Sequence, residues 1–291
     1  MRHATPARRS QIVAGIAFAL TFLLSAPAAD AATVKERTIG SDAPVVSVSS
    51  SQTDGTVWAL AERGALKEMY KVRVSTGSVI TSDPVSSQAS AIAQSPNGVL
   101  ALGTSNGAAS AVVLYSGASG SYTATVPIDS PAIDLAIGTG GFKCYVLEAT
   151  RPDRTLFVFN QTHKGFSYQV GPNAIAIAPV NAGTDVWILQ SNGFLEEMSL
   201  NPDRIVRKME VGLKSEGLVA SSNGRVLYVL ADTNSPKAKQ IRLLSTTGRV
   251  TGVVLVPPGS RSLAVSPSGS NVFDAVAESG IGAVVVLAFR P

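Results

Sequence analysis

Residues 131–170 read PAIDLAIGTGGFKCYVLEATRPDRTLFVFNQTHKGFSYQV, and this stretch decides the fold. It holds four short runs rich in β-branched and aromatic residues, at 132–137, 143–148, 155–160 and 166–170, with Gly, Pro, Asp and other polar residues between them. Runs of this length bounded by turn residues are typical of β-strands joined by hairpins. Because no sustained helical period runs through the stretch, it predicts a four-stranded antiparallel sheet.

The same pattern recurs along the chain. Six segments combine an apolar strand, a turn with Gly, Asn or Ser, and a second apolar strand: 44–61, 89–103, 131–147, 172–189, 216–230 and 261–276. Equivalent second-strand positions are Leu60, Leu102, Leu147, Leu189, Leu230 and Val276, with spacings of 42, 45, 42, 41 and 46 residues. Four-stranded propeller blades repeat at this period. The sequence therefore predicts an all-β chain, a single six-bladed β-propeller of four-stranded antiparallel blades. Two stacked sheets or a β-solenoid are the competing arrangements, and they fit the four-strand period less well.

The last unit supplies three strands, of which residues 283–289 form the third. Residues 34–39 precede the first unit, alternate apolar with charged or polar side chains, and belong to no other unit. We expect this N-terminal strand to complete the last blade and to close the ring. Closure of this kind removes open sheet edges, which otherwise template aggregation.

Two turns and two strands carry a family resemblance. The turns are Ser95-Pro96-Asn97-Gly98 and Ser266-Pro267-Ser268-Gly269, and the strands are Tyr145-Val146-Leu147 and Tyr228-Val229-Leu230. In these features the chain resembles the YVTN-type β-propeller repeat family of secreted and periplasmic bacterial proteins, over nearly its whole length after residue 31. It departs from that family in showing six units where seven are common, so a seven-bladed ring is the alternative. The shared motifs are structural, since Pro and Gly set the turns and aromatic and β-branched residues pack between blades.

The N-terminus has the three-part plan of a secretory signal peptide. Arg2, Arg8 and Arg9 precede an uncharged apolar run at 12–24, and two overlapping A-x-A sites end at Ala28 and Ala31. We expect cleavage after residue 28 or 31, so that 1–31 is the signal peptide and 32–291 the propeller. An uncleaved anchor is the alternative, but the apolar run is shorter than the ~20 residues of a spanning helix. The expected location is secreted or periplasmic, without stable membrane insertion.

The net charge and the cysteine count exclude one class of partner and one kind of covalent link. Residues 1–28 contain three of the 24 Lys and Arg residues and none of the 20 acids, so the remaining chain carries 21 against 20, a net charge of +1. This near-neutral balance lacks the basic field of a nucleic-acid-binding protein, and no nucleic-acid partner is expected. The chain has one cysteine, Cys144, and therefore no intrachain disulfide.

The sequence holds no motif that specifies a chemistry. After the signal segment there is one histidine, His163, which we interpret as a solvated loop residue, and Cys144 is expected to be a packed interior thiol. Haem-attachment, zinc-cluster and phosphate-loop patterns are absent from the sequence. We therefore predict no catalytic residue, no metal ligand set and no cofactor.

Charged residues in the loops of one propeller face are the candidates for binding. These loops lead into the first strand of a blade or join its second and third strands, and Asp134 lies just inside a first strand, where it is expected to face the central channel. The candidate ligand-binding residues are Asp42, Asp83, Asp129, Asp134, Glu216 and Arg261. Such carboxylates could hold a hard cation through oxygen ligands, or form solvated ion pairs with neighbouring Arg and Lys residues.

Three functions are open at this point. The first is a non-catalytic binding or scaffold propeller that holds an envelope or extracellular protein, peptide or glycan on one face. The second is a metal-assisted hydrolase, such as a lactonase-like enzyme, using carboxylates in the central channel. The third is an accessory subunit of a periplasmic redox enzyme. One propeller framework hosts unrelated functions, so the fold alone does not choose among them.

Overall fold

The computed structural model describes residues 34–289 apart from 42, 52–54, 96, 108, 117–120, 139–142, 161, 163, 213, 234 and 279–280. The expected signal peptide, Asp42 and His163 lie outside the described residues. The described part is almost entirely β-strand, with one short 3₁₀ turn, η1 (Asn181–Gly183). Within it, no helix is long and apolar enough to cross a membrane.

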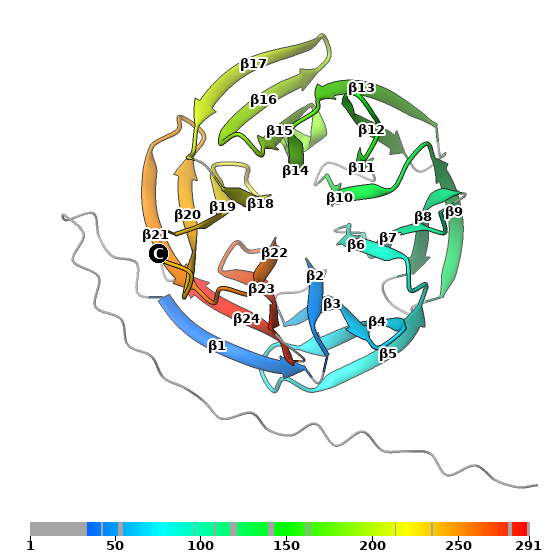
Figure 1. Ribbon diagram of the computed structural model, residues 1–291, viewed down its shortest axis with the longest axis vertical. Coiled ribbons are helices and arrows are strands. Elements are labelled where there is room, and N and C mark those ends of the chain that lie inside the picture. The colour runs from blue at the N-terminus through cyan, green and yellow to red at the C-terminus, as the bar shows by residue number, and fades with distance from the viewer. Residues whose placement is uncertain are drawn as a thin grey trace, which may run out of the picture.

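Six four-stranded antiparallel sheets stand in a ring around a central opening (Figure 1). Blade 1 consists of β2 (Val45–Ser50), β3 (Thr56–Arg63), β4 (Leu66–Arg73) and β5 (Val79–Val85). Blade 2 consists of β6 (Ala89–Gln94), β7 (Val99–Ser105), β8 (Ser110–Ser116) and β9 (Tyr122–Ile128). Blade 3 consists of β10 (Ala132–Ile137), β11 (Lys143–Glu148), β12 (Arg154–Asn160) and β13 (Gly165–Gly171). Blade 4 consists of β14 (Ala174–Val180), β15 (Asp185–Gln190), β16 (Phe194–Leu200) and β17 (Asp203–Glu210). Blade 5 consists of β18 (Ser215–Ala220), β19 (Val226–Asp232), β20 (Lys239–Ser245) and β21 (Val250–Val256).

Blade 6 is built from both ends of the described chain. Its strand order is β22 (Ser260–Val265), β23 (Asn271–Glu278), β24 (Ile281–Phe289) and β1 (Val34–Ser41). β1 pairs antiparallel with β24 over its whole length, from Val34 opposite Phe289 to Ser41 opposite Gly282. The predicted closure by an N-terminal strand and the predicted count of six blades are both confirmed.

The core lies between neighbouring blades. Between blades 2 and 3, for example, Ala101 and Val112 pack with Val146 and Phe159, and Cys144 belongs to the same buried cluster. Near the ring centre the blades approach closely, since a Cβ at Gly103 would lie 2.9 Å from the Cβ of Ala132. Burial of this apolar surface is the main stabilising term, and Cys144 is the packed interior thiol that its position predicted.

Every first strand carries a β-bulge at the same place. The register against the second strand shifts between its first and third residues in all six blades, as at Ser215/Gly217 and Ser260/Ser262. A bulge leaves one residue unpaired and re-aims its side chain. The residues at the six bulges are Val46, Ser90, Ile133, Ile175, Glu216 and Arg261, and all six line the channel cavity.

Polar side chains tie each blade to the next. We call these side-chain-to-carbonyl hydrogen bonds between blades the boundary bonds. They run from Lys67 to Ala89 (2.6 Å), Ser90 to Ala132 (2.9 Å), Tyr145 to Gly183 (2.8 Å), Arg207 to Thr246, Lys239 to Ser260 (2.8 Å), and Arg37 to Ser75. Each blade boundary therefore has at least one polar link besides its apolar core.

Candidate functional site

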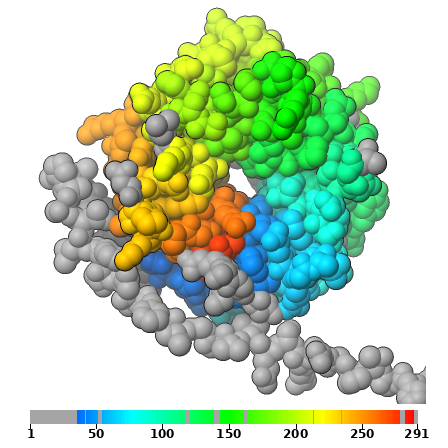
Figure 2. All heavy atoms as spheres, viewed as in Figure 1, coloured from blue at the N-terminus to red at the C-terminus, as the bar shows by residue number. Residues whose placement is uncertain are grey.

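The central channel holds a cavity of about 110 Å³ lined by the first strands of all six blades. The space-filling view shows the opening at the middle of the ring (Figure 2). Of the six bulge residues, Val46, Ile133 and Ile175 are apolar and Ser90 is neutral. The charged pair, Glu216 and Arg261, lies on adjacent blades 5 and 6. Charge at the bulge positions is therefore concentrated at one blade boundary.

The structure brings together three of the six residues predicted to bind a ligand. Asp134, Glu216 and Arg261 all line the channel cavity. Asp83 lies on β5, the outermost strand of its blade, where it accepts a hydrogen bond from the Thr81 hydroxyl at 3.2 Å. Asp129 is exposed in the connection between blades 2 and 3, and Asp42 lies outside the described residues.

Asp134 links two blades through its carboxylate. One oxygen accepts the backbone N–H of Leu135 at 2.9 Å, and the other accepts that of Ile177 in blade 4 at 2.8 Å. Burial raises the pKa of Asp134 to about 7, although these two hydrogen bonds act in the opposite direction. Ser47 occupies the equivalent position in blade 1 and accepts the N–H of Ile92 in blade 2 at 3.3 Å. The Asp134 carboxylate thus repeats a structural contact of the fold.

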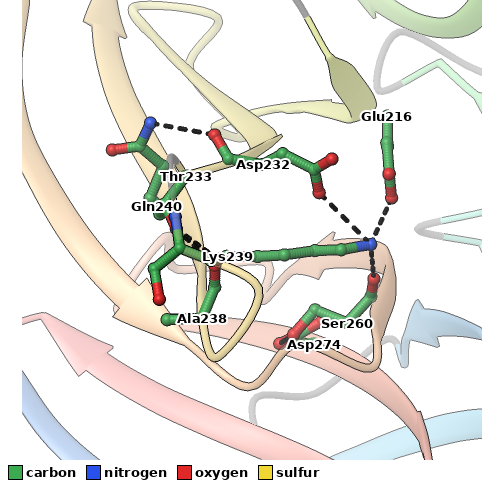
Figure 3. Close-up of polar contacts among 9 residues, drawn as sticks. Glu216, Asp232, Thr233, Ala238, Lys239, Gln240, Ser260 and Asp274 are labelled. Carbon is green, nitrogen blue, oxygen red and sulfur yellow. Dashed lines mark hydrogen bonds and ion pairs between the residues drawn. The ribbon is translucent and has the colours of Figure 1, made fainter.

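Lys239 is the centre of the polar network at the boundary of blades 5 and 6 (Figure 3). Its Nζ forms an ion pair with Glu216, donates to the carbonyl of Ser260 at 2.8 Å, and lies 4.0 Å from Asp232. Blade 1 repeats part of this arrangement, since Lys67 donates to the carbonyl of Ala89 and lies 3.4 Å from Glu62. The lysine is therefore a recurring link between blades, and the added contact with Glu216 distinguishes blade 5, because the equivalent bulge residue in blade 1 is a valine.

Asp274 lies behind this network and is fully buried. One carboxylate oxygen accepts the Ser260 hydroxyl at 2.5 Å, and the other has no hydrogen-bond partner among the described residues. Burial raises the pKa of Asp274 to about 7, while the Ser260 bond and the nearby Lys239 charge act to lower it. The carboxyl group is thus poised to change its protonation state near neutral pH.

Sequence reasoning missed Asp274 and Lys239. The repeat itself carried a signal for Asp274, because cross-strand pairing aligns it with an apolar residue in each of the other five blades. Those residues are Ala59, Leu102, Val146, Ile188 and Val229. A carboxylate at a position that is otherwise apolar is a departure from the repeat that alignment of the six units would have revealed.

The arrangement suits recognition by hydrogen bonds and ion pairs. Arg261 is exposed at the channel mouth and lines the cavity together with Glu216, Ser90 and Ser262. Within the described ranges, no three His, Cys, Asp or Glu side chains gather into a group that could hold a metal ion. The two carboxylates of the channel lining, Asp134 and Glu216, stand on different blades and are each engaged by other groups.

Comparison with known proteins identifies the fold. No family model and no curated protein matches the chain. Among solved structures, the hydrazine synthase of Kuenenia stuttgartiensis is similar, with a TM-score of 0.60 and 14% identity over 81% of this chain and 75% of that one. U3-55K is similar with a TM-score of 0.60 and 12% identity over 87% of this chain and 98% of that one. At these identities the likeness shows the fold alone, and the chain is a six-bladed β-propeller.

Proposed function

We propose that the chain is a non-catalytic binding or scaffold propeller of the cell envelope or extracellular space. Its partner would be a protein, peptide or glycan held on the propeller face that carries the channel mouth. The observation that carries the proposal is the channel lining itself. The bulge positions of blades 5 and 6 present Glu216 and the exposed Arg261 to a channel whose accessible surface is mostly polar. Polar groups that converge on one concave site are a common feature of binding sites.

Two buried nucleophilic side chains, Ser260 and Cys144, are not accessible for covalent catalysis. Ser260 donates its hydroxyl proton to Asp274, but the side chain is fully buried and offers a substrate no access. Cys144 is equally buried, and burial raises the pKa of its thiol, which keeps it protonated and unreactive. Both groups are placed for packing.

The location and the family are part of the proposal. The signal-peptide pattern of residues 1–31 supports secretion or export to the periplasm. The Ser-Pro-Asn-Gly and Tyr-Val-Leu motifs support membership of the YVTN-type repeat family. Mass spectrometry of the exported protein tests the first point, with an expected N-terminus at Ala29 or Ala32. An exported protein that retains residues 1–28 would contradict it.

Site-specific photo-crosslinking tests the binding face. A photo-reactive amino acid at position 261 is expected to capture a defined partner in intact cells. The same residue at position 73, on an exposed site at the opposite face, is the matched control and is expected not to capture it. Capture of the same species from both positions, or from neither, would contradict a partner at the channel mouth.

A further inference from the structure

A second cavity, of about 290 Å³, opens between blades 4 and 5. Its walls include Trp187 on β15, Glu197 on β16, Arg207 on β17, and Asn223 and Arg225 in the turn between β18 and β19. This turn joins the first and second strands of blade 5, whereas Glu216 and Arg261 lie at the starts of first strands. The cavity therefore lies on the face opposite the channel mouth, and a role for it goes beyond the proposed function.

Glu197 is the residue that departs from the repeat at this cavity. It pairs across the sheet with Trp187 on one side and Arg207 on the other. The equivalent third-strand positions of the other blades are Lys71, Leu114, Val158, Leu243 and Val286. Four of these five are apolar, so the propeller fold does not require a polar group here. The Glu197 side chain is only 12% exposed, so its carboxylate carries a desolvation cost, and burial accordingly raises the pKa of Glu197. A carboxylate whose pKa is shifted by burial at a cavity wall marks a candidate functional site.

The charge of Glu197 is already compensated within the wall. Its carboxylate lies 3.5 Å from Nε of Arg207. The same guanidinium donates to the carbonyl of Thr246 in blade 5 and lies 5.8 Å from the centre of the Trp187 ring. Arg207 is thus held by three contacts, and its ion pair with Glu197 has no net charge.

Arg225 supplies the uncompensated charge. Its side chain is exposed at the cavity, and in the described part of the chain its guanidinium forms no ion pair. The backbone N–H of Arg225 donates to Oδ1 of Asn223 at 3.0 Å, and the Ser221 hydroxyl donates to the same oxygen at 2.8 Å. The oxygen of Asn223 is therefore used, and its amide nitrogen remains as a donor beside Arg225.

The indole of Trp187 lies in the wall, and its ring nitrogen is closed to solvent, as is that of Trp58 at the equivalent position of blade 1. The Trp187 side chain is fully buried, and its Nε1–H has no acceptor among the described residues. At the preceding boundary the equivalent aromatic residue, Tyr145, does have one, since its hydroxyl donates to Gly183 in the next blade at 2.8 Å. The residues that line the cavity thus carry one net positive charge, with the Arg225 guanidinium and the Asn223 amide as donors, while the Asp185 carboxylate near Glu197 lies outside the lining.

We propose that the cavity between blades 4 and 5 binds a small carboxylate-bearing molecule, with its carboxylate against Arg225 and Asn223. A guanidinium group presents paired N–H donors that match the two oxygens of a carboxylate. The volume lies near the lower end of the ~300–1,000 Å³ usual for ligand sites. It therefore suits a single sugar acid or amino-acid derivative and not a polymer.

NMR of the two tryptophan indole groups tests the proposal directly. The chain has two tryptophans, and Trp58 is equally buried, with no acceptor for its Nε1–H among the described residues, which makes it an internal control. Glucuronate and N-acetylalanine are titrated as the carboxylate probes, with glucose and inorganic phosphate as comparisons. We expect at least one of the two carboxylates to shift the Trp187 signal while the Trp58 signal stays in place. The tighter of the two probes shows whether the source is a sugar acid or an amino-acid derivative.

Two arginine variants test whether the Arg225 charge is responsible for carboxylate binding. Arg225→Ala is expected to weaken binding by about tenfold or more, in line with a hydrogen bond to a charged group, and to leave thermal unfolding unchanged. Arg73→Ala removes an equally exposed arginine from the same face of blade 1 and is expected to leave binding unchanged. The proposal fails if neither carboxylate shifts the Trp187 signal, if glucose or phosphate shifts it equally, or if Arg225→Ala binds like the unaltered protein.

Discussion

Replacing Asp274 by valine should stabilise the propeller at and above neutral pH. In the unfolded chain an Asp carboxyl titrates near pH ~3.9, whereas burial raises the pKa of Asp274 to about 7 in the folded protein. Folding therefore favours the protonated carboxyl. Below about pH 4 both states hold the proton and there is no penalty, and the penalty grows as the pH rises to about 7.

The difference of about three pKa units corresponds to about 4 kcal/mol lost above pH 7. Valine removes this loss and restores the apolar character that the other five blades have at the same position. It also deprives the Ser260 hydroxyl of its acceptor, at a cost of about 1 kcal/mol. The expected net gain is thus about 3 kcal/mol above pH 7, turning into a loss of about 1 kcal/mol at pH 4.

Urea unfolding followed by tryptophan fluorescence between about pH 4 and 8 gives the free energy of unfolding at each pH. The difference between the variant and the unaltered protein is the informative quantity, because the other ionisable groups, Asp134 among them, are present in both. Asp274→Asn keeps a polar partner for Ser260 without a charge and should show the same pH dependence as the valine variant. A difference between variant and unaltered protein that does not change with pH would refute the assignment of a buried, ionising Asp274.

Three further outcomes follow from the structure. Removing residues 34–41 should abolish folding or expose the edge of β24 and cause aggregation in light scattering, while a variant that folds and stays monomeric would contradict closure by β1. Lys239→Met should lower the free energy of unfolding by about 1–3 kcal/mol, because it removes the partner of Glu216 and of the Ser260 carbonyl. In the same urea assay the control Lys237→Met, at an exposed position, should change this free energy little. Cys144 should resist alkylation in the native protein and react fully in urea, as measured by mass spectrometry, so rapid native labelling would show that blade 3 opens locally.

The architecture was predictable because it depends on a repeated pattern. The spacing of Leu60, Leu102 and their counterparts fixed the blade period, and the alternation at 34–39 identified the closing strand before any coordinates. Each of these patterns rests on many residues, so a single atypical residue does not hide it.

The candidate site was predictable only in part, for a physical reason. Glu216 and Arg261 were found because they lie at the start of first strands, where the bulge turns them toward the channel. The Lys239 network depends on a third-strand lysine reaching the next blade, and this contact between separate units leaves no mark in the local sequence. Asp83 was placed with them because loop position alone does not tell an inner from an outer strand.

The last blade brings together strands from opposite ends of the chain, and this sets the order in which the ring can be completed. β1 is made first and β24 last, so the edge that β1 must occupy does not exist until the other five blades have been synthesised. Blades 1 to 5 contain only strands that are near neighbours in the sequence and can form one after another. Closure of the ring therefore follows the formation of blades 1 to 5, and until it occurs β1 and β24 each carry an unpaired edge that is open to pairing with other chains.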